Sequence, residues 1–311
     1  MQPKLITVVG TTASGKSSLG IELAARLDGE VVSADSRQIY RGLDLGTGKV
    51  TPEEICGVPH HLLDIRDPGE SYSMAEFQRD AYLVIDGIIE RGRTPFLVGG
   101  TGLYARSVTR GYTLVDVEPD PAFRAEMEQK SREELVAMIA SYGEQITDRQ
   151  ISPRRLIRIL EKYRAGAPTT PECHPRYHTL QLGLTWPREV LYARIEERLD
   201  ARLAAGMVEE VQGLMERGAT PEFLETLGLE YRYTYRYLAG KYPSFADYRA
   251  ELLTEIRRFA KRQQTWFAKD KDIVWLDSDG DYLAQALELC TLFLRAKETP
   301  DDTDWYGGAD L

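Results

Sequence analysis

The chain has 311 residues, of which 42% are hydrophobic and 28% charged, so it can bury a sizeable core and is neither disordered nor fibrous. Its net charge of −10 has the wrong sign for a protein that coats nucleic acid indiscriminately, so a nucleic-acid partner would need a local basic surface. The sequence has no apolar run near the roughly 18 residues of a membrane-spanning helix and no secretory signal at its N-terminus, so we expect a cytoplasmic protein without membrane contact.

Strand and helix patterns alternate through the first hundred residues. Residues 4–9 predict a buried strand, and leucines at helical spacing predict a helix over 16–27. Further strands are predicted at 30–34 and 94–98, with a helix over 73–91 before the second of them. The alternation predicts an α/β fold, a P-loop-type parallel sheet flanked by helices.

The pattern changes in the middle of the chain. Residues 113–175 contain no convincing strand but two helical patterns, at 120–141 and 153–164, which predict a mainly helical insertion. Strands at 180–185 and 273–276 and long helices at 187–217 and 244–269 follow. We therefore expect a first core part over 1–112, the insertion over 113–175, a mostly helical second core part over 176–296 and a disordered acidic tail over 297–311.

A phosphate-binding loop is predicted between the first strand and the first helix. The pattern G-x-x-x-x-G-K-[ST] is met by Gly10, Thr11, Thr12, Ala13, Ser14, Gly15, Lys16 and Ser17. Its glycines let backbone N–H groups converge on phosphate oxygens at a helix N-terminus. Lys16 is expected against the outer phosphates and Ser17 to offer its hydroxyl to Mg²⁺. The loop predicts binding of a di- or triphosphate.

The loop alone does not name the reaction. Nucleotide kinases and hydrolases normally carry an acidic residue at the end of a second hydrophobic strand, to hold magnesium. The strand at 94–98 instead ends in Gly99, Gly100 and Thr101. Asp35 is the acidic residue well placed after a strand, and it could cap the next segment, bind magnesium or act as a general base.

Longer motifs resemble those of the tRNA dimethylallyltransferases (isopentenyl-diphosphate:tRNA transferases). They lie at 33–49, 59–64, 72–77, 98–104 and 260–267 and, with the phosphate loop, extend over most of the chain. The resemblance implies transfer of the dimethylallyl group from dimethylallyl diphosphate to the exocyclic amine of the adenosine 3′-adjacent to the anticodon in tRNA. The phosphate loop would then hold the diphosphate of the donor, with Mg²⁺ as cofactor.

The resemblance also implies roles for individual residues. Asp35 would accept the proton of the adenine amine, while Lys16 and Thr101 would stabilise the departing diphosphate. Arg194 and Arg198 match positions near the diphosphate. The residues that match tRNA contacts are Asp35, Ser36, Arg37, Gln38, Thr101, Arg124, Arg154, Arg155 and Arg158. From the residues alone, Arg194 and Arg198 could equally be surface charges of a helix, and a solvated face is the favoured interpretation of Arg124, Arg154, Arg155 and Arg158.

The chain departs from the family's pattern on the acceptor side, at Ile151-Ser152 and at Leu229-Glu230. These departures would suit an inactive tRNA-binding relative, which is less favoured, as is a P-loop nucleotide kinase or hydrolase. The main alternative is an adenylate isopentenyltransferase, which modifies AMP, ADP or ATP. The arginine-bearing insertion favours an anticodon stem-loop as partner, because a mononucleotide needs no such clamp. We expect the enzyme to act as a monomer.

Overall fold

The computed structural model describes residues 2–115, 117–147 and 151–296. The chain forms two compact units: the core unit, Met1–Thr109 with Pro175–Leu311, and the helical unit, Arg110–His174. The tail expected to be disordered, 297–311, lies outside the described residues. Within the described ranges, no helix is long and apolar enough to cross a membrane.

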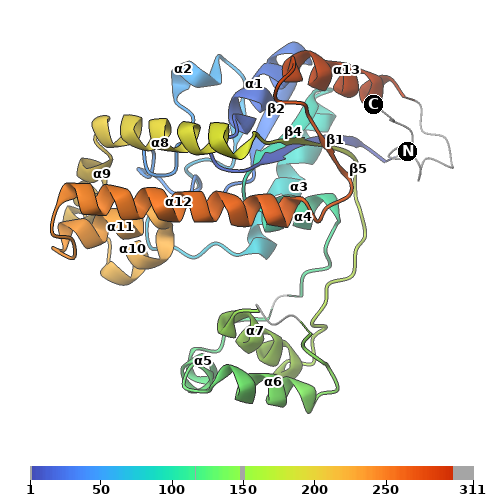
Figure 1. The fold of residues 1–311 in the computed structure, drawn as a ribbon. Coiled ribbons are helices and arrows are strands. Elements are labelled where there is room, and N and C mark those ends of the chain that lie inside the picture. The colour runs from blue at the N-terminus through green and yellow to red at the C-terminus, as the bar shows by residue number, and fades with distance from the viewer. Residues whose placement is uncertain (1, 116, 148–150, 297–311) are drawn as a thin grey trace. The chain divides into compact units, whose positions relative to one another are not determined.

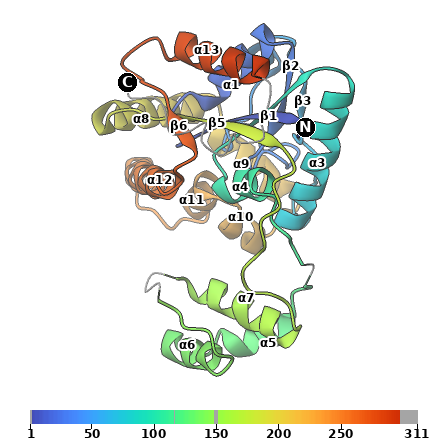
Figure 2. The same ribbon diagram turned by 90° about the vertical axis from the view of Figure 1, so that its right-hand side faces the viewer.

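The core unit is built on a parallel sheet whose described strands run in the order β3-β2-β4-β1-β5-β6 (Figures 1 and 2). The strands are β1 (Lys4–Gly10), β2 (Gly29–Ser33), β3 (His60–His61), β4 (Thr94–Gly99), β5 (His178–Leu184) and β6 (Ile273–Trp275). In the centre of the sheet, Val8 pairs with Val98 on one side and with Leu182 on the other. The predicted α/β class is confirmed.

Helices cover both faces of this sheet. Ile6 and Val8 pack in a buried cluster with α1 (Lys16–Arg26) and α13 (Tyr282–Arg295). Leu5 and Val9, on the opposite face, pack with α3 (Met74–Glu90) and α4 (Gly102–Thr109). Parallel strands need such cover because both of their faces are apolar. The loops at the carboxyl ends of β1, β2 and β4 remain available for a site.

Further helices of the core unit pack together beside these loops. They are α8 (Arg188–Ala204), α9 (Met207–Glu216), α10 (Pro221–Leu227), α11 (Leu229–Leu238) and α12 (Phe245–Phe267), and a short helix α2 (Pro52–Ile55) precedes them in the chain. Figure 1 shows α8 and α12 side by side, and they share a buried cluster that contains Ile195 and Ile256. Ala13 of the phosphate loop belongs to the same cluster, so these helices support that loop.

The single helix predicted over 187–217 is wrong. Gly206 separates α8 from α9 with a φ of +101°, a left-handed conformation that glycine adopts readily and other residues do not. The remaining predicted elements of the core unit differ from the observed ones only at their ends. The sequence patterns did not predict α2, β3, α4, α10, α11 or α13.

The helical unit contains α5 (Pro121–Met127), α6 (Arg132–Ala140) and α7 (Pro153–Arg164) around its own buried cluster. The single helix predicted over 120–141 is wrong, because Ser131 begins a new helix. Its hydroxyl accepts a hydrogen bond from the Glu134 N–H, and the Glu134 carboxylate accepts one from the Ser131 N–H. This capping box satisfies backbone donors that a continuous helix would have paired internally.

Candidate active site

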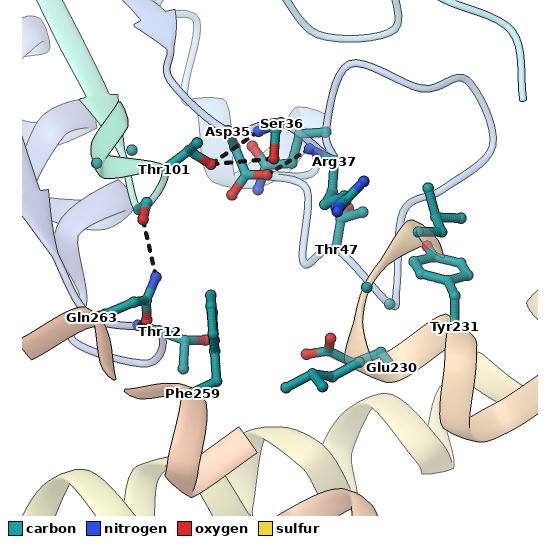
Figure 3. A pocket seen from close by; sticks show the side chains of 18 of the residues that line it. Thr12, Asp35, Ser36, Arg37, Thr47, Thr101, Glu230, Tyr231, Phe259 and Gln263 are labelled. Carbon is teal, nitrogen blue, oxygen red and sulfur yellow. Dashed lines mark hydrogen bonds between the residues drawn. The ribbon is translucent and has the colours of Figure 1, made fainter. Parts of the chain in front are cut away.

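A pocket of about 570 Å³ lies in the core unit, between the strand-end loops and helices α8, α10, α11 and α12 (Figure 3). Its position follows from the parallel sheet, since the carboxyl ends of neighbouring strands meet at one edge. The predicted site residues that line it are Thr12, Lys16, Ser17, Asp35, Ser36, Arg37, Gln38, Thr101 and Arg198. Residues far apart in the sequence therefore meet around one cavity.

Asp35 and Thr101 lie on neighbouring loops that follow β2 and β4. The Thr101 N–H donates to the Ala34 carbonyl over 3.2 Å, and the Thr101 hydroxyl oxygen accepts from the Ser36 N–H over 3.1 Å. A Cβ on Gly99 would collide with that Ala34 carbonyl, so only glycine allows this approach. Figure 3 shows the Asp35 carboxylate and the Thr101 hydroxyl on the same side of the pocket.

The Asp35 carboxylate is oriented by its own loop. Its Oδ1 accepts a hydrogen bond from the Arg37 N–H at 2.8 Å, which fixes the side chain as an Asx-type turn does. Gln38 braces the same loop, because its amide donates to the Gly48 carbonyl at 3.2 Å and its oxygen accepts from the Ser33 hydroxyl at 3.3 Å. Gln38 therefore lines the pocket, but the oxygen and the nitrogen of its side-chain amide are both hydrogen-bonded within the protein.

Lys16, Arg198 and Arg202 are three of the cationic side chains that line the pocket. Burial, followed by the positive charge of Arg198, lowers the pKa of Lys16 to about 8. Burial and the charge of Arg202 lower the pKa of Arg198 to about 10. A Cβ on Gly48 would collide with the guanidinium groups of both arginines, so a glycine makes room for them. The mutual repulsion of these cations would be relieved by a bound anion.

The sequence motifs assigned no site role to Arg202 or Glu230. Arg202 pairs with a Glu230 carboxylate oxygen at 3.4 Å and donates to the Gly46 carbonyl at 3.4 Å. Glu230, a departure from the family's pattern, thus supplies a counter-charge in the pocket, while Leu229 lines the same pocket and packs against the buried cluster shared by α8 and α12. The signal in the sequence was the spacing of Arg198 and Arg202, which places both on one face of a helix.

The other predicted diphosphate ligands do not line the pocket: Gly10, Thr11, Ala13, Ser14, Gly15 and Arg194. Arg194 contacts the phosphate loop instead, since its Nε donates to the Ala13 carbonyl at 2.9 Å and its guanidinium stacks over Trp186 at 4.8 Å. This arrangement supports the loop conformation. Direct contact of Arg194 with a diphosphate stays a prediction.

Apolar side chains border the charged part of the pocket. Leu103 and Phe259, which are 55% and 38% exposed, present apolar surface beside the cavity. Trp266 packs against Gly102, and Phe267 is buried. A cavity with a cationic end, a carboxylate and apolar walls suits a phosphorylated substrate that also carries an apolar group.

The predicted tRNA contacts of the helical unit fall into two pairs. Arg124 donates to both oxygens of Glu161, at 2.7 and 2.9 Å, and Arg158 donates to the same carboxylate at 2.8 Å. Burial disfavours the charge of Glu161, but the hydrogen bonds from both arginines outweigh it and lower its pKa to about 2. Arg154 and Arg155, by contrast, are exposed at the start of α7.

The other departure from the family's pattern has a local role in the same unit. The Ser152 hydroxyl accepts a hydrogen bond from the Arg155 N–H and caps α7. Ile151 packs against the buried cluster of the helical unit. These two residues therefore support the helix that presents Arg154 and Arg155.

A magnesium ion fits the pocket only together with a phosphorylated ligand. The described residues hold no group of three or more His, Cys, Asp or Glu side chains that could bind a metal by themselves. Mg²⁺ is commonly bound by one or two protein oxygens, substrate phosphates and water. The Ser17 hydroxyl lines the pocket beside the cations and meets that requirement.

Comparisons with known proteins agree with this geometry. A family model described as IPP transferase matches residues 38–270. The chain is 43% identical over 298 residues to tRNA dimethylallyltransferase 2 of Shewanella sediminis, which covers 92% of this chain and 97% of the relative. It is 42% identical over 292 residues to a tRNA dimethylallyltransferase of Symbiobacterium thermophilum, with 90% and 91% covered.

Solved structures resemble the chain over a similar extent. The full-length tRNA isopentenylpyrophosphate transferase from Bacillus halodurans has a TM-score of 0.71 and 38% identity, with 93% of this chain and 96% of that chain covered. A eukaryotic dimethylallyltransferase acting on tRNA has a TM-score of 0.79 and 26% identity, with 96% and 81% covered. The matches run through both units of the chain.

Proposed function

This chain belongs to the IPP transferase family, and we propose that it is a tRNA dimethylallyltransferase, which prenylates the exocyclic amine of the adenosine 3′-adjacent to the anticodon and releases diphosphate. The observation that carries the function is one pocket whose lining brings together the Asp35 carboxylate, the Thr101 hydroxyl and a group of cationic side chains that includes Lys16, Arg198 and Arg202. The names of relatives at 42–43% identity favour a tRNA acceptor over the free adenylates of an adenylate isopentenyltransferase.

Asp35 is the group we assign to the acceptor. The adenine amine is a weak nucleophile because its lone pair is delocalised into the ring. As its nitrogen bonds to C1 of the dimethylallyl group, its proton passes to the Asp35 carboxylate, which acts as general base. The Arg37 N–H holds this carboxylate in place, so little reorientation is needed when the substrate arrives.

Lys16, Arg198 and Thr101 are the groups we assign to the donor. The bond between C1 and the bridging oxygen breaks as the new bond forms, and negative charge grows on the departing diphosphate. These groups already line the pocket and stabilise that charge there. The Thr101 hydroxyl, which donates to Ser36 Oγ over 3.4 Å, has only to rotate to donate to the diphosphate instead. A magnesium ion held by Ser17 and the diphosphate would supply further positive charge there.

The helical unit is the part we assign to the anticodon stem-loop. Arg154 and Arg155 are the exposed cations of the predicted set, whereas Arg124 and Arg158 neutralise Glu161. Both guanidinium groups donate to the one buried Glu161 carboxylate, so they have less net positive charge and fewer N–H donors left for RNA phosphates than Arg154 and Arg155 have. We therefore assign contact with RNA phosphates to Arg154 and Arg155 in preference to Arg124 and Arg158.

We also propose that the protein acts as a monomer.

Replacing Arg154 and Arg155 together with serine should weaken tRNA binding and flatten its salt dependence. Each lost phosphate contact reduces the slope of log affinity against log salt by about 0.7–0.9, so the double variant should lose about one to two units of slope. Filter binding of unmodified tRNA across a salt series measures this. The control is Arg26→Ser, an exposed arginine on α1. An unchanged slope in the double variant would move the RNA-binding surface elsewhere.

Donor affinity should fall as pH rises above about 8. In the free protein Lys16 has its pKa near 8, whereas bound diphosphate favours the protonated amine and raises that pKa. Below pH 8 Lys16 is already protonated, so donor affinity does not depend on the protonation of Lys16. Above pH 8 the protein has to take up a proton when the donor binds, so donor affinity falls by up to about tenfold per pH unit. Calorimetry with dimethylallyl diphosphate between pH 7 and 9.5 measures both affinity and proton uptake. Lys16→Met should bind the donor more weakly, and its donor affinity should not fall above pH 8. If donor affinity fell with pH equally steeply in both proteins, the assignment of Lys16 would be contradicted.

The test of the function itself is nucleoside mass spectrometry. The protein is incubated with dimethylallyl diphosphate and magnesium, either with unmodified tRNA that carries adenosine 3′ of the anticodon or with AMP, ADP and ATP. We expect prenylated adenosine from the tRNA digest alone. Product from the free nucleotides alone would establish the adenylate reaction, and phosphate release from ATP without donor would support a hydrolase.

A further inference from the structure

Gln263 forms a bridge between two loops that carry the proposed catalytic groups. Its Oε1 accepts a hydrogen bond from the Thr12 N–H at 2.8 Å, and its Nε2 donates to the Gly100 carbonyl at 3.0 Å (Figure 3). Thr12 belongs to the phosphate loop after β1, and Gly100 to the loop after β4. The opposite orientation of the amide would place donor against donor and oxygen against oxygen, so this network fixes it.

The backbone that carries Gln263 is held firmly. Residues earlier in α12, among them Leu252, Ile256 and Ala260, are buried among the helices that support the phosphate loop. Phe267, one turn beyond Gln263, is buried in the cluster on one face of the sheet. Because α12 is packed in a buried cluster on each side of Gln263, its position is fixed. It can therefore determine the distance between the two loops to which Gln263 is hydrogen-bonded.

Both loops carry residues of the proposed mechanism. Lys16 begins the helix after the phosphate loop, and its amine lies near Gly100, because a Cβ on that glycine would be 3.3 Å from Lys16 Nζ. Thr101 follows Gly100 directly and binds the Ser36 N–H, next to Asp35. The bridge therefore runs from the donor-binding loop through Gly100 and Thr101 to the base.

We propose that Gln263 is a positioning residue for prenyl transfer, which holds the phosphate loop at a fixed separation from Thr101 and Asp35. This inference rests on the proposed function. The amine and C1 of the donor react only when held about 3–3.5 Å apart in line, and a displacement of about 1 Å costs on the order of 100-fold in rate. A carboxamide fits because it accepts and donates at once; a leucine does neither, and a glutamate cannot donate to the Gly100 carbonyl.

The predicted signature is a loss of rate without a loss of donor affinity. Gln263→Leu should lower the single-turnover rate at saturating donor and tRNA by about 10–100-fold, while the Kd for dimethylallyl diphosphate changes less than threefold. Gln263→Glu should lower both rate and donor affinity, because it adds a negative charge beside the diphosphate site. The matched control is Gln264→Leu: Gln264 is exposed, adjacent and outside the pocket lining, so it should behave as wild type.

Hydrogen exchange gives a readout that does not depend on activity. In Gln263→Leu the segments 11–16 and 99–103 should both exchange faster, with the rest of the core unit and the melting temperature unchanged, and Gln264→Leu should show neither effect. Unchanged exchange in these segments would overturn the proposal, as would a rate within twofold of wild type, or tighter donor binding with no loss of rate. A wild-type protein that prenylates no tRNA would overturn the proposed function, and the exchange result would then decide on Gln263 by itself.

Discussion

Asp35→Asn is expected to lower kcat by about 10²–10⁴-fold, the usual contribution of a general base, while tRNA and donor affinity stay near wild type. Asparagine keeps the shape of the side chain and an oxygen for the Arg37 N–H, so the loop should hold its conformation. It cannot take the proton of the adenine amine. Single-turnover transfer to tRNA, measured beside the two binding constants, separates the chemical step from binding.

The pH and the control for this experiment follow from the structure. The Asp35 charge helps to raise the pKa of Lys16, so its removal would lower that pKa further, and measurement at pH 7 keeps Lys16 protonated in both proteins. Asp28→Asn is a matched control, since Asp28 is exposed at the opposite end of β2 and its positive φ of 46° suits asparagine. If Asp35→Asn kept near-normal turnover, another group would have to be the base.

Lys16→Met is expected to lower kcat/KM by about 10²–10³-fold, the effect of removing one preorganised group that stabilises developing charge. Methionine retains most of the length and apolar volume of lysine, so the phosphate loop should keep its packing. The loss should appear in both donor affinity and rate, because the ammonium attracts the diphosphate before transfer and more strongly as the bond to carbon breaks. Steady-state kinetics with donor varied at saturating tRNA tests this.

Two further variants sharpen the interpretation. Lys16→Arg keeps the charge but brings a wider, planar group against Gly100, so it should recover donor affinity more than rate. Lys271→Met, which removes an exposed lysine between α12 and β6, should leave both unchanged. A Lys16→Met enzyme with wild-type kcat and KM would remove Lys16 from the mechanism.

Much of the site could be predicted because its motifs are local. The phosphate loop and the segment from Asp35 to Gln38 each lie in a few consecutive residues at the end of a strand, and the α/β topology then brings strand ends together. The sequence could not reveal which charged side chains would be paired with other side chains of the protein itself. Arg124 and Arg158 look like Arg154 and Arg155 in the chain, yet a buried Glu161 binds only the first two.

The helix predictions show the same limit at a smaller scale. Apolar spacing continues across Gly206 and Ser131, so periodicity alone joined helices that a left-handed glycine and a capping box separate. Periodicity reports which side of a helix is buried, whereas a helix end depends on the conformation and capping of single residues.

By itself the sequence determined the α/β class and the family, and it located the proposed phosphate loop and the proposed catalytic carboxylate at the ends of two strands. The tertiary structure alone decided the Arg202–Glu230 pair in the pocket and the bridge from Gln263 to Thr12 across 251 residues of chain. The physical reason is that a motif encodes the conformation of its own backbone. A contact between distant segments depends instead on how each helix is rotated and packed, which is set by the whole core together.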